Sequence, residues 1–178
     1  QFGDKFLNDS NSLAFFKTFG MEKELSKINE DLQLFRVKFD VISHESKIKS
    51  GDSLFKEIEF LNKFIYKDGE ALVLKTSDFL DDKDRVIVKS DGECTYFLPD
   101  IVYHVDKLSR GFDYLIDVLG ADHHGYINRM KSALMMHGHK EDVLHIEIIQ
   151  MVRIFQNGEE MKLSKRTGKT ITLRELCE

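Results

Sequence analysis

The order of apolar segments between residues 98 and 149 constrains this fold more than any other feature. Apolar residues at steps of three and four predict a helix that begins near Pro99, and residues 114–119 (YLIDVL) give a compact strand signal. A second helical pattern over residues 126–137 and a second strand pattern over 143–149 follow. Helix, strand, helix, strand in this order predicts an α/β fold with a parallel, doubly wound sheet.

The region before this alternation has a different pattern. Residues 1–35 carry amphipathic helical spacing, with Gly20 as the predicted stop between two helices. Between residues 64 and 97, short apolar runs flank two Asp-Gly turns, which predicts β-hairpins. We therefore predict a helical segment over residues 1–39, an inserted α+β subdomain over 40–95, and the α/β fold over 96–178.

Charge and cysteine usage narrow the class of protein. The chain has 26 basic and 31 acidic residues and a net charge of −5, which excludes a nonspecific nucleic-acid coat but leaves room for a local basic surface. Cys94 and Cys177 form no metal-ligand spacing and favour a reducing, cytoplasmic setting. No run approaches the roughly 20 apolar residues that span a bilayer, so we expect no membrane partner.

A basic segment, residues 161–169 (MKLSKRTGK), is the strongest candidate for phosphate chemistry. Lys162 and Lys165 supply positive charge, and Ser164 supplies a hydroxyl between them. Such a loop can close around a polyphosphate through ammonium, hydroxyl and backbone N–H groups. The alternative is an ordinary solvated basic surface, which short runs of this kind often form.

A Gly-x-Asp sequence follows the first predicted strand of the α/β region. In open α/β sheets ligands bind at the carboxyl ends of strands. Gly120 would let the backbone approach a ligand, and the Asp122 carboxylate would accept hydrogen bonds from ribose hydroxyls. Asp122 is equally suited to capping the next helix, and the sequence leaves both roles open.

Two metal sites are considered and neither is favoured. Adjacent His123 and His124 point in different directions from a turn, so they rarely bind one zinc ion, even with His104 in the same region. A histidine there suits a phosphate oxygen better. The acidic run 81–84 lacks the glycine and distal glutamate of a calcium loop, so we predict a solvated turn.

Tyr96 and Asp100 are four residues apart at the predicted start of a helix. This spacing lets both face one cleft, where an aspartate would pair with a guanidinium or ammonium group. From these residues alone, the favoured interpretation of Asp100 is a partner of the helix dipole. No nucleophile–histidine arrangement is evident, so an enzyme of this sequence would rely on positioning and electrostatics, as in nucleotidyl transfer.

Taken together, these motifs resemble one family. KLSKR at residues 162–166 resembles the KMSKS signature of class I aminoacyl-tRNA synthetases, with Leu163 in place of methionine. Blocks at residues 81–113, 118–131 and 148–176 are similar, in order and spacing, to the bacterial arginyl-tRNA synthetase family. The resemblance is strong from residue 39 onward and loose before it.

The resemblance implies the second half of a Rossmann-type catalytic domain with a connective insertion. It implies activation of L-arginine by ATP with Mg²⁺, followed by transfer to tRNA(Arg). The residues it assigns to ATP are Lys162, Ser164 and Lys165 for the triphosphate, Gly120 and Asp122 for the ribose with His123 or His124 nearby, and Met151 and Val152 for adenine. It assigns Tyr96 and Asp100 to arginine, which reverses the dipole interpretation of Asp100.

One departure from the family is large. None of the seven histidines lies in the His-x-Gly-His sequence that the family places at the start of its nucleotide fold. We therefore expect a piece of a longer protein that is inactive alone. Two alternatives remain: a tRNA- or partner-binding module without catalysis, and a different nucleotidyl transferase that uses the same phosphate loop.

Overall fold

The computed structural model describes residues 9–156, 158–161 and 171–177. Packing divides the chain into two units, one of residues 43–152 and one of residues 1–42 with 153–178. The first unit contains a hydrophobic core and is described first.

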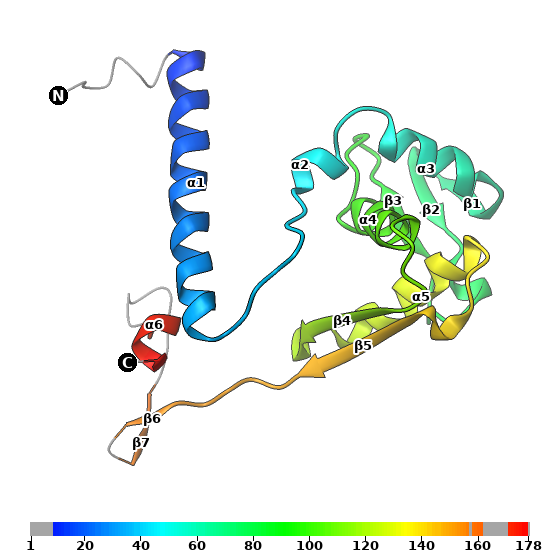
Figure 1. The fold of residues 1–178 in the computed structure, drawn as a ribbon. Helices are drawn as coiled ribbons and strands as arrows, with labels where there is room; N and C mark the ends of the chain where they lie inside the picture. Colours follow the sequence, from blue (N-terminus) through cyan, green and yellow to red (C-terminus); the bar gives the residue numbers. More distant parts are fainter. Residues whose placement is uncertain (1–8, 157, 162–170, 178) are drawn as a thin grey trace. The chain divides into compact units, whose positions relative to one another are not determined.

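A pair of parallel strands forms the α/β part of the 43–152 unit (Figure 1). β4 (Leu115–Gly120) and β5 (Leu144–Ile149) pair in register, from Leu115 opposite Leu144 to Gly120 opposite Ile149. Parallel neighbours need a crossover, which here contains a helix. This arrangement confirms the predicted α/β fold with a parallel sheet.

Two helices pack against the strands and the rest of the core. α4 (Phe97–Ser109) starts with Pro99 in its first turn, as predicted, and α5 (Ile127–Met136) lies in the crossover. A short 3₁₀ segment (Glu141–Val143) leads into β5. The fully or almost fully buried side chains shared by these elements are Leu98, Ile101, Leu115, Met130, Leu134 and Leu144.

The remainder of this unit is a small antiparallel sheet with short helices before it. β1 (Ile65–Asp68), β2 (Ala71–Leu74) and β3 (Arg85–Val88) lie in that order. The helical segments are α2 (Glu45–Ile48), α3 (Ser53–Leu61), and the 3₁₀ turns Asn62–Phe64 and Thr76–Asp78.

The two predicted hairpins have different outcomes. The Asp68-Gly69 turn joins β1 to β2, with Gly69 at a positive φ of 59°. The second hairpin is wrong in its return strand, because Cys94 forms only an isolated bridge with Val88 and Phe97 already begins α4. The boundaries of the connective insertion, 40–95, stay a prediction.

The other unit contains a long helix and short C-terminal elements. α1 (Ser10–Leu34) runs through Gly20 without a break, so the predicted stop is wrong. Gly20 takes no positive φ, and one helical glycine costs only about 1 kcal/mol. β6 (Phe155–Gln156) pairs with β7 (Glu159–Glu160), and α6 (Leu173–Cys177) contacts α1 through Arg174, which lies 2.7 Å from Asp31.

Within the ranges that the structure describes, no helix has both the length and the apolar character needed to cross a bilayer.

Candidate active site

The carboxyl ends of β4 and β5 define the candidate site. β4 ends at Gly120 and passes directly into a 3₁₀ segment, η4 (Ala121–Tyr126). Ile149 ends β5 opposite Gly120, so both strands finish at the same edge. Ligands bind at this edge in open α/β sheets, which is the position predicted for Gly-x-Asp.

Gly120 and Asp122 are in close contact. A Cβ built on Gly120 would lie 2.8 Å from Oδ1 of Asp122, nearer than real Cβ atoms approach. The absence of a side chain at Gly120 therefore lets the Asp122 carboxylate rest against the strand end. The capping role considered for Asp122 is wrong, because α5 starts from Tyr126 with no side-chain cap. Its carboxylate is exposed, with Nε2 of His123 at 3.7 Å.

Substituting Gly120→Ala should separate binding from stability. The displaced atom is the end of a flexible side chain, so we expect a change in unfolding free energy within about 1 kcal/mol. If Asp122 holds the ribose, its displacement should weaken ATP binding about tenfold, the scale of one hydrogen bond to a charged group. Thermal unfolding and ATP titration of the complete protein check this. Unchanged ATP affinity would remove Asp122 from the site.

Asp100 lies in the first turn of α4, half-buried against η4. Burial raises the pKa of its carboxyl group, and a hydrogen bond from Tyr126 together with the charge of His104 partly opposes that rise. Burial and the neighbouring Asp100 charge also raise the pKa of Tyr126, so this hydroxyl remains a donor. The contact between Asp100 and Tyr126 places the start of α4 beside the turn that follows β4.

Tyr96 lies on the exposed side of the same helix start. Its side chain is 82% exposed, and Nζ of Lys49 lies 5.8 Å from the centre of its ring. The backbone N–H of Asp100 donates to the Tyr96 carbonyl at 3.3 Å. The structure thus brings the predicted pair to one place in the fold, with Asp100 inward and Tyr96 outward.

Sequence reasoning missed the residues behind Asp100. His104, considered only as a metal ligand, is buried and lies between the Asp100 carbonyl and Asp117 of β4. Asp117 lies between Leu115 and Leu119 on the inward face of β4, whose other side chains are all apolar. A charge at an inward strand position was the signal that could have found it, because buried charges require partners.

The two histidines of η4 are exposed and separate. His123 lies edge-on to Tyr126, with ring centres 6.4 Å apart. His124 lines a hollow of about 490 Å³, together with the start of α5, the 81–84 loop and Arg85 at the start of β3. In the described part of the chain, no group of three His, Cys, Asp or Glu side chains is arranged to hold a metal ion.

The 81–84 loop differs from its prediction. The Asp81 side chain is buried and accepts two hydrogen bonds from Arg85, at 2.7 and 2.6 Å. A solvated turn is therefore wrong for Asp81, whose carboxylate is occupied by a guanidinium. Asp82 is exposed and also contacts Arg85, at 2.5 Å.

Of the remaining predicted residues, the structure describes the two assigned to adenine and does not describe the three assigned to the triphosphate. Met151 and Val152 follow β5 with largely exposed side chains, two and three residues beyond the partner of Gly120. Lys162, Ser164 and Lys165 lie outside the described residues, and their role in phosphate binding stays a prediction.

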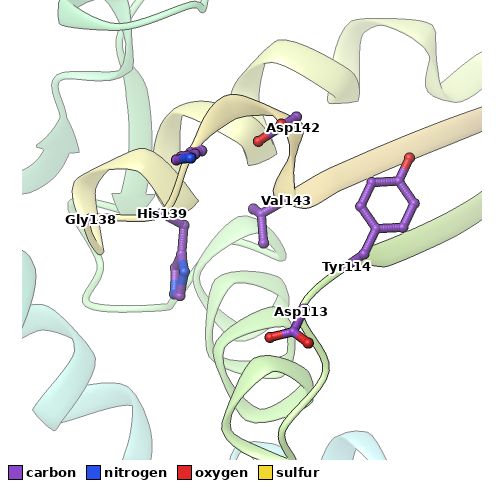
Figure 2. Close-up of a pocket in the computed structure, with 7 residues that line it drawn as sticks. Asp113, Tyr114, Gly138, His139, Asp142 and Val143 are labelled. Carbon is purple, nitrogen blue, oxygen red and sulfur yellow. The ribbon is translucent and has the colours of Figure 1, made fainter.

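A second hollow lies at the opposite ends of the strands. Figure 2 shows residues that line it, among them Asp113 and Tyr114 before β4, Asp142 and Val143 before β5, and His139. Its volume is about 380 Å³. Because it lies at the amino ends of the strands, it is not where ligands bind in open α/β sheets.

Comparisons with known proteins give the family of the chain. The family described as "tRNA synthetases class I (R), catalytic domain" matches residues 9–178, which extends the similarity well before residue 39. Arginine–tRNA ligase of Bacillus subtilis is 49% identical over the whole chain, and that of Geobacillus thermodenitrificans is 48% identical. The chain spans about a third of the length of these relatives.

Solved structures give the same fold. A protein of Campylobacter jejuni described as a putative arginyl tRNA synthetase superposes with a TM-score of 0.86 at 36% identity, over 98% of this chain and 38% of its own. The arginyl-tRNA synthetase of Thermus thermophilus superposes with a TM-score of 0.63 over 79% of this chain and 32% of its own. At 16% identity, that second match supports the fold alone.

Proposed function

We propose, since this chain belongs to the catalytic-domain family of the class I tRNA synthetases (R), that the protein carrying it is an arginine–tRNA ligase. The observation that supports the proposal is the half-buried Asp100 in the first turn of α4, which accepts a hydrogen bond from Tyr126 of the turn that follows β4. The reaction would activate L-arginine with ATP and then transfer the arginyl group to tRNA(Arg). Substrates, partners and a cytoplasmic location are all part of this proposal.

Asp100 is the residue we assign to the substrate guanidinium. A carboxylate removed from water attracts a cation more strongly than an exposed one, because the local dielectric is lower. Arginine donates two parallel hydrogen bonds to such a group, which selects it by geometry as well as charge. Tyr96, exposed at the same helix start, would cover the arginine from the solvent side.

ATP would bind across the strand ends. Gly120 and Asp122 would contact the ribose with His123 or His124 nearby, and backbone groups of Met151 and Val152 would meet adenine. We assign the triphosphate to Lys162, Ser164 and Lys165. Mg²⁺ would arrive with ATP and needs no dedicated protein cage, because it is held largely by phosphates and water.

The reaction needs no covalent intermediate with the protein, so the protein contributes by positioning the substrates and stabilising charge. A carboxylate oxygen of arginine would attack the α-phosphorus, and the bond from that phosphorus to pyrophosphate would break. Negative charge then grows on the departing phosphates, where lysine ammonium groups stabilise it. The terminal ribose hydroxyl of tRNA would next attack the arginyl carbonyl, releasing AMP.

Pyrophosphate exchange in the complete protein tests the proposal. With tRNA present, we expect exchange to depend on arginine, and lysine or glutamine to support none. Exchange with lysine or glutamine equal to that with arginine would overturn the assignment. So would salt-dependent tRNA binding without any binding of ATP, which is the behaviour of a noncatalytic module.

The 178-residue chain alone is a useful second sample. It contains no His-x-Gly-His sequence, so we expect it to support no exchange. Full exchange by this chain would show that the reaction needs no histidine motif of that kind.

A further inference from the structure

A buried hydrogen-bonded network lies behind Asp100. His104 is 4% exposed, and its Nδ1 lies 2.7 Å from the Asp100 carbonyl oxygen. Its Nε2 lies 2.6 Å from Oδ2 of Asp117 on β4. Nζ of Lys107, one helical turn further along α4, donates to Oδ1 of the same carboxylate at 2.8 Å. The network therefore joins α4 to β4 through two donors and one carboxylate.

The hydrogen bonds fix the protonation state of the ring. A carbonyl oxygen only accepts, so Nδ1 of His104 must carry a proton. Burial opposes ionisation of Asp117, but hydrogen bonds and charge from His104 and Lys107 lower its pKa to about 2, and the Lys107 ammonium at 2.8 Å favours the ionised carboxylate whatever the charge of the ring. An ionised carboxylate also only accepts, so Nε2 must carry a proton as well. His104 thus donates through both nitrogens, which makes it an imidazolium.

A positive ring at this place affects Asp100. Burial favours the neutral form of the Asp100 carboxyl group, and a neutral carboxyl would bind a cation poorly. The His104 charge favours the ionised form. The other titratable and charged groups whose charges or hydrogen bonds act on Asp100, Asp117 or Tyr126 are Glu45 of α2, Lys107 of α4, Asp117 of β4, Tyr126 of η4 and Arg129 of α5.

We propose that His104 and Asp117 are positioning residues for Asp100: Asp117 keeps His104 doubly protonated, and the charged ring keeps Asp100 ionised and fixed at the start of α4. This inference rests on the proposed function, because it treats Asp100 as the arginine-binding carboxylate. Neither residue is assigned any contact with substrate. They act on arginine only through Asp100.

The test is the pH dependence of arginine use in the complete protein. His104→Gln removes the charge of the ring, so the pKa of Asp100 should rise. In the pH profile of kcat/KM for arginine, the acid limb should then move to higher pH by about one unit. Near the foot of that limb this equals about a tenfold loss. Asp117→Asn should move the limb in the same direction but by less, because the Asp117 charge itself raises the pKa of Asp100 and is lost with the substitution. Raising the pH should restore both variants, and KM for ATP should stay within about twofold, since Asp100 is proposed to bind only arginine.

A second buried pair gives the matched control. Nε2 of His137 lies 2.6 Å from Glu57, with both side chains below 10% exposed. His137→Gln removes an equivalent pair, and the charges that act most on Asp100 are those of His104, Glu45 and Asp117, so this variant should alter stability without moving the acid limb. A purely structural role for His104 would give the same result as this control and would overturn the inference.

Two further outcomes separate the inference from the function it rests on. If the unsubstituted protein shows no preference for arginine, the proposed function fails. If it prefers arginine but His104→Gln keeps the original acid limb, only the positioning role fails. Ring-nitrogen NMR of the unsubstituted protein near pH 7 needs no variant to fold. Protons on both nitrogens of His104 would support the inference, and one bare nitrogen would overturn it.

Discussion

Asp100→Asn is expected to raise KM for arginine about 100-fold while KM for ATP changes less than about threefold, since removing one member of a buried charge pair costs about 3 kcal/mol. The substitution keeps the size of the side chain and removes only its charge. Asparagine also presents an N–H where the guanidinium needs an acceptor, so the second hydrogen bond is lost. Arginine-dependent exchange, with arginine and ATP varied separately, measures both constants.

Asp106→Asn is the control for this substitution. Asp106 lies on the same helix, but it is exposed and pairs with Arg110. Removing its charge should change neither constant by more than about twofold, because an exposed ion pair contributes under about 1 kcal/mol. An equal loss of arginine and ATP use in Asp100→Asn would contradict the guanidinium role and point instead to a general distortion of α4.

The helices and strands whose positions depend on local sequence pattern were predicted most reliably. The strands at residues 115–120 and 144–149 were predicted from short, compact apolar runs, and both form where those runs lie. Pro99 marked the start of α4 correctly, because its fixed φ suits a first helical turn. Gly20 misled, since a single glycine weakens a helix without ending it.

Pairings between distant elements could not be predicted in the same way. His104 and Asp117 meet only because α4 packs on β4, so the sequence showed two separate polar residues and no network. Asp81 looked like part of a solvated acidic run, although the structure buries it under Arg85. In each case the fold decides which charge lies inside, and local composition does not.

In the candidate site too, features set by local sequence were predictable and features set by packing were not. Gly120, Asp122 and Asp100 could be proposed from position, because strand ends and helix starts are local features that a known topology brings together. The outward direction of Tyr96 and the inward direction of Asp100 follow from packing and were not predictable. The roles of Lys162, Ser164 and Lys165 stay predictions.

Asp81→Asn is expected to lower the unfolding free energy by about 3 kcal/mol, because breaking a buried ion pair leaves its partner uncompensated. The Asp81 side chain is 2% exposed and meets Arg85 through both carboxylate oxygens. Asparagine presents an N–H toward a guanidinium that only donates, so one hydrogen bond becomes a repulsion. Urea unfolding of the 178-residue chain, followed by circular dichroism, measures the change.

Asp82→Asn is a closely matched control, since Asp82 is the next residue and contacts the same Arg85. Its side chain is 75% exposed, so water replaces the lost charge and we expect less than about 1 kcal/mol. Equal losses from the two variants would contradict the importance of burial and attribute the effect to the net charge of the loop.

The same ion pair predicts an acid dependence with a definite sign. Burial opposes the ionisation of Asp81, but hydrogen bonds from Arg85 and Asp82 lower its pKa from 3.8 to about 2. Because the folded pKa lies below the unfolded one, the carboxylate stabilises the fold above about pH 4 and loses that contribution as pH falls toward about 2. Asp81→Asn should therefore flatten the stability curve over this range, while Asp82→Asn should leave its slope largely intact. A slope unchanged in Asp81→Asn would assign the acid dependence to other carboxylates, of which Asp117, with its pKa also lowered to about 2, is the first to test.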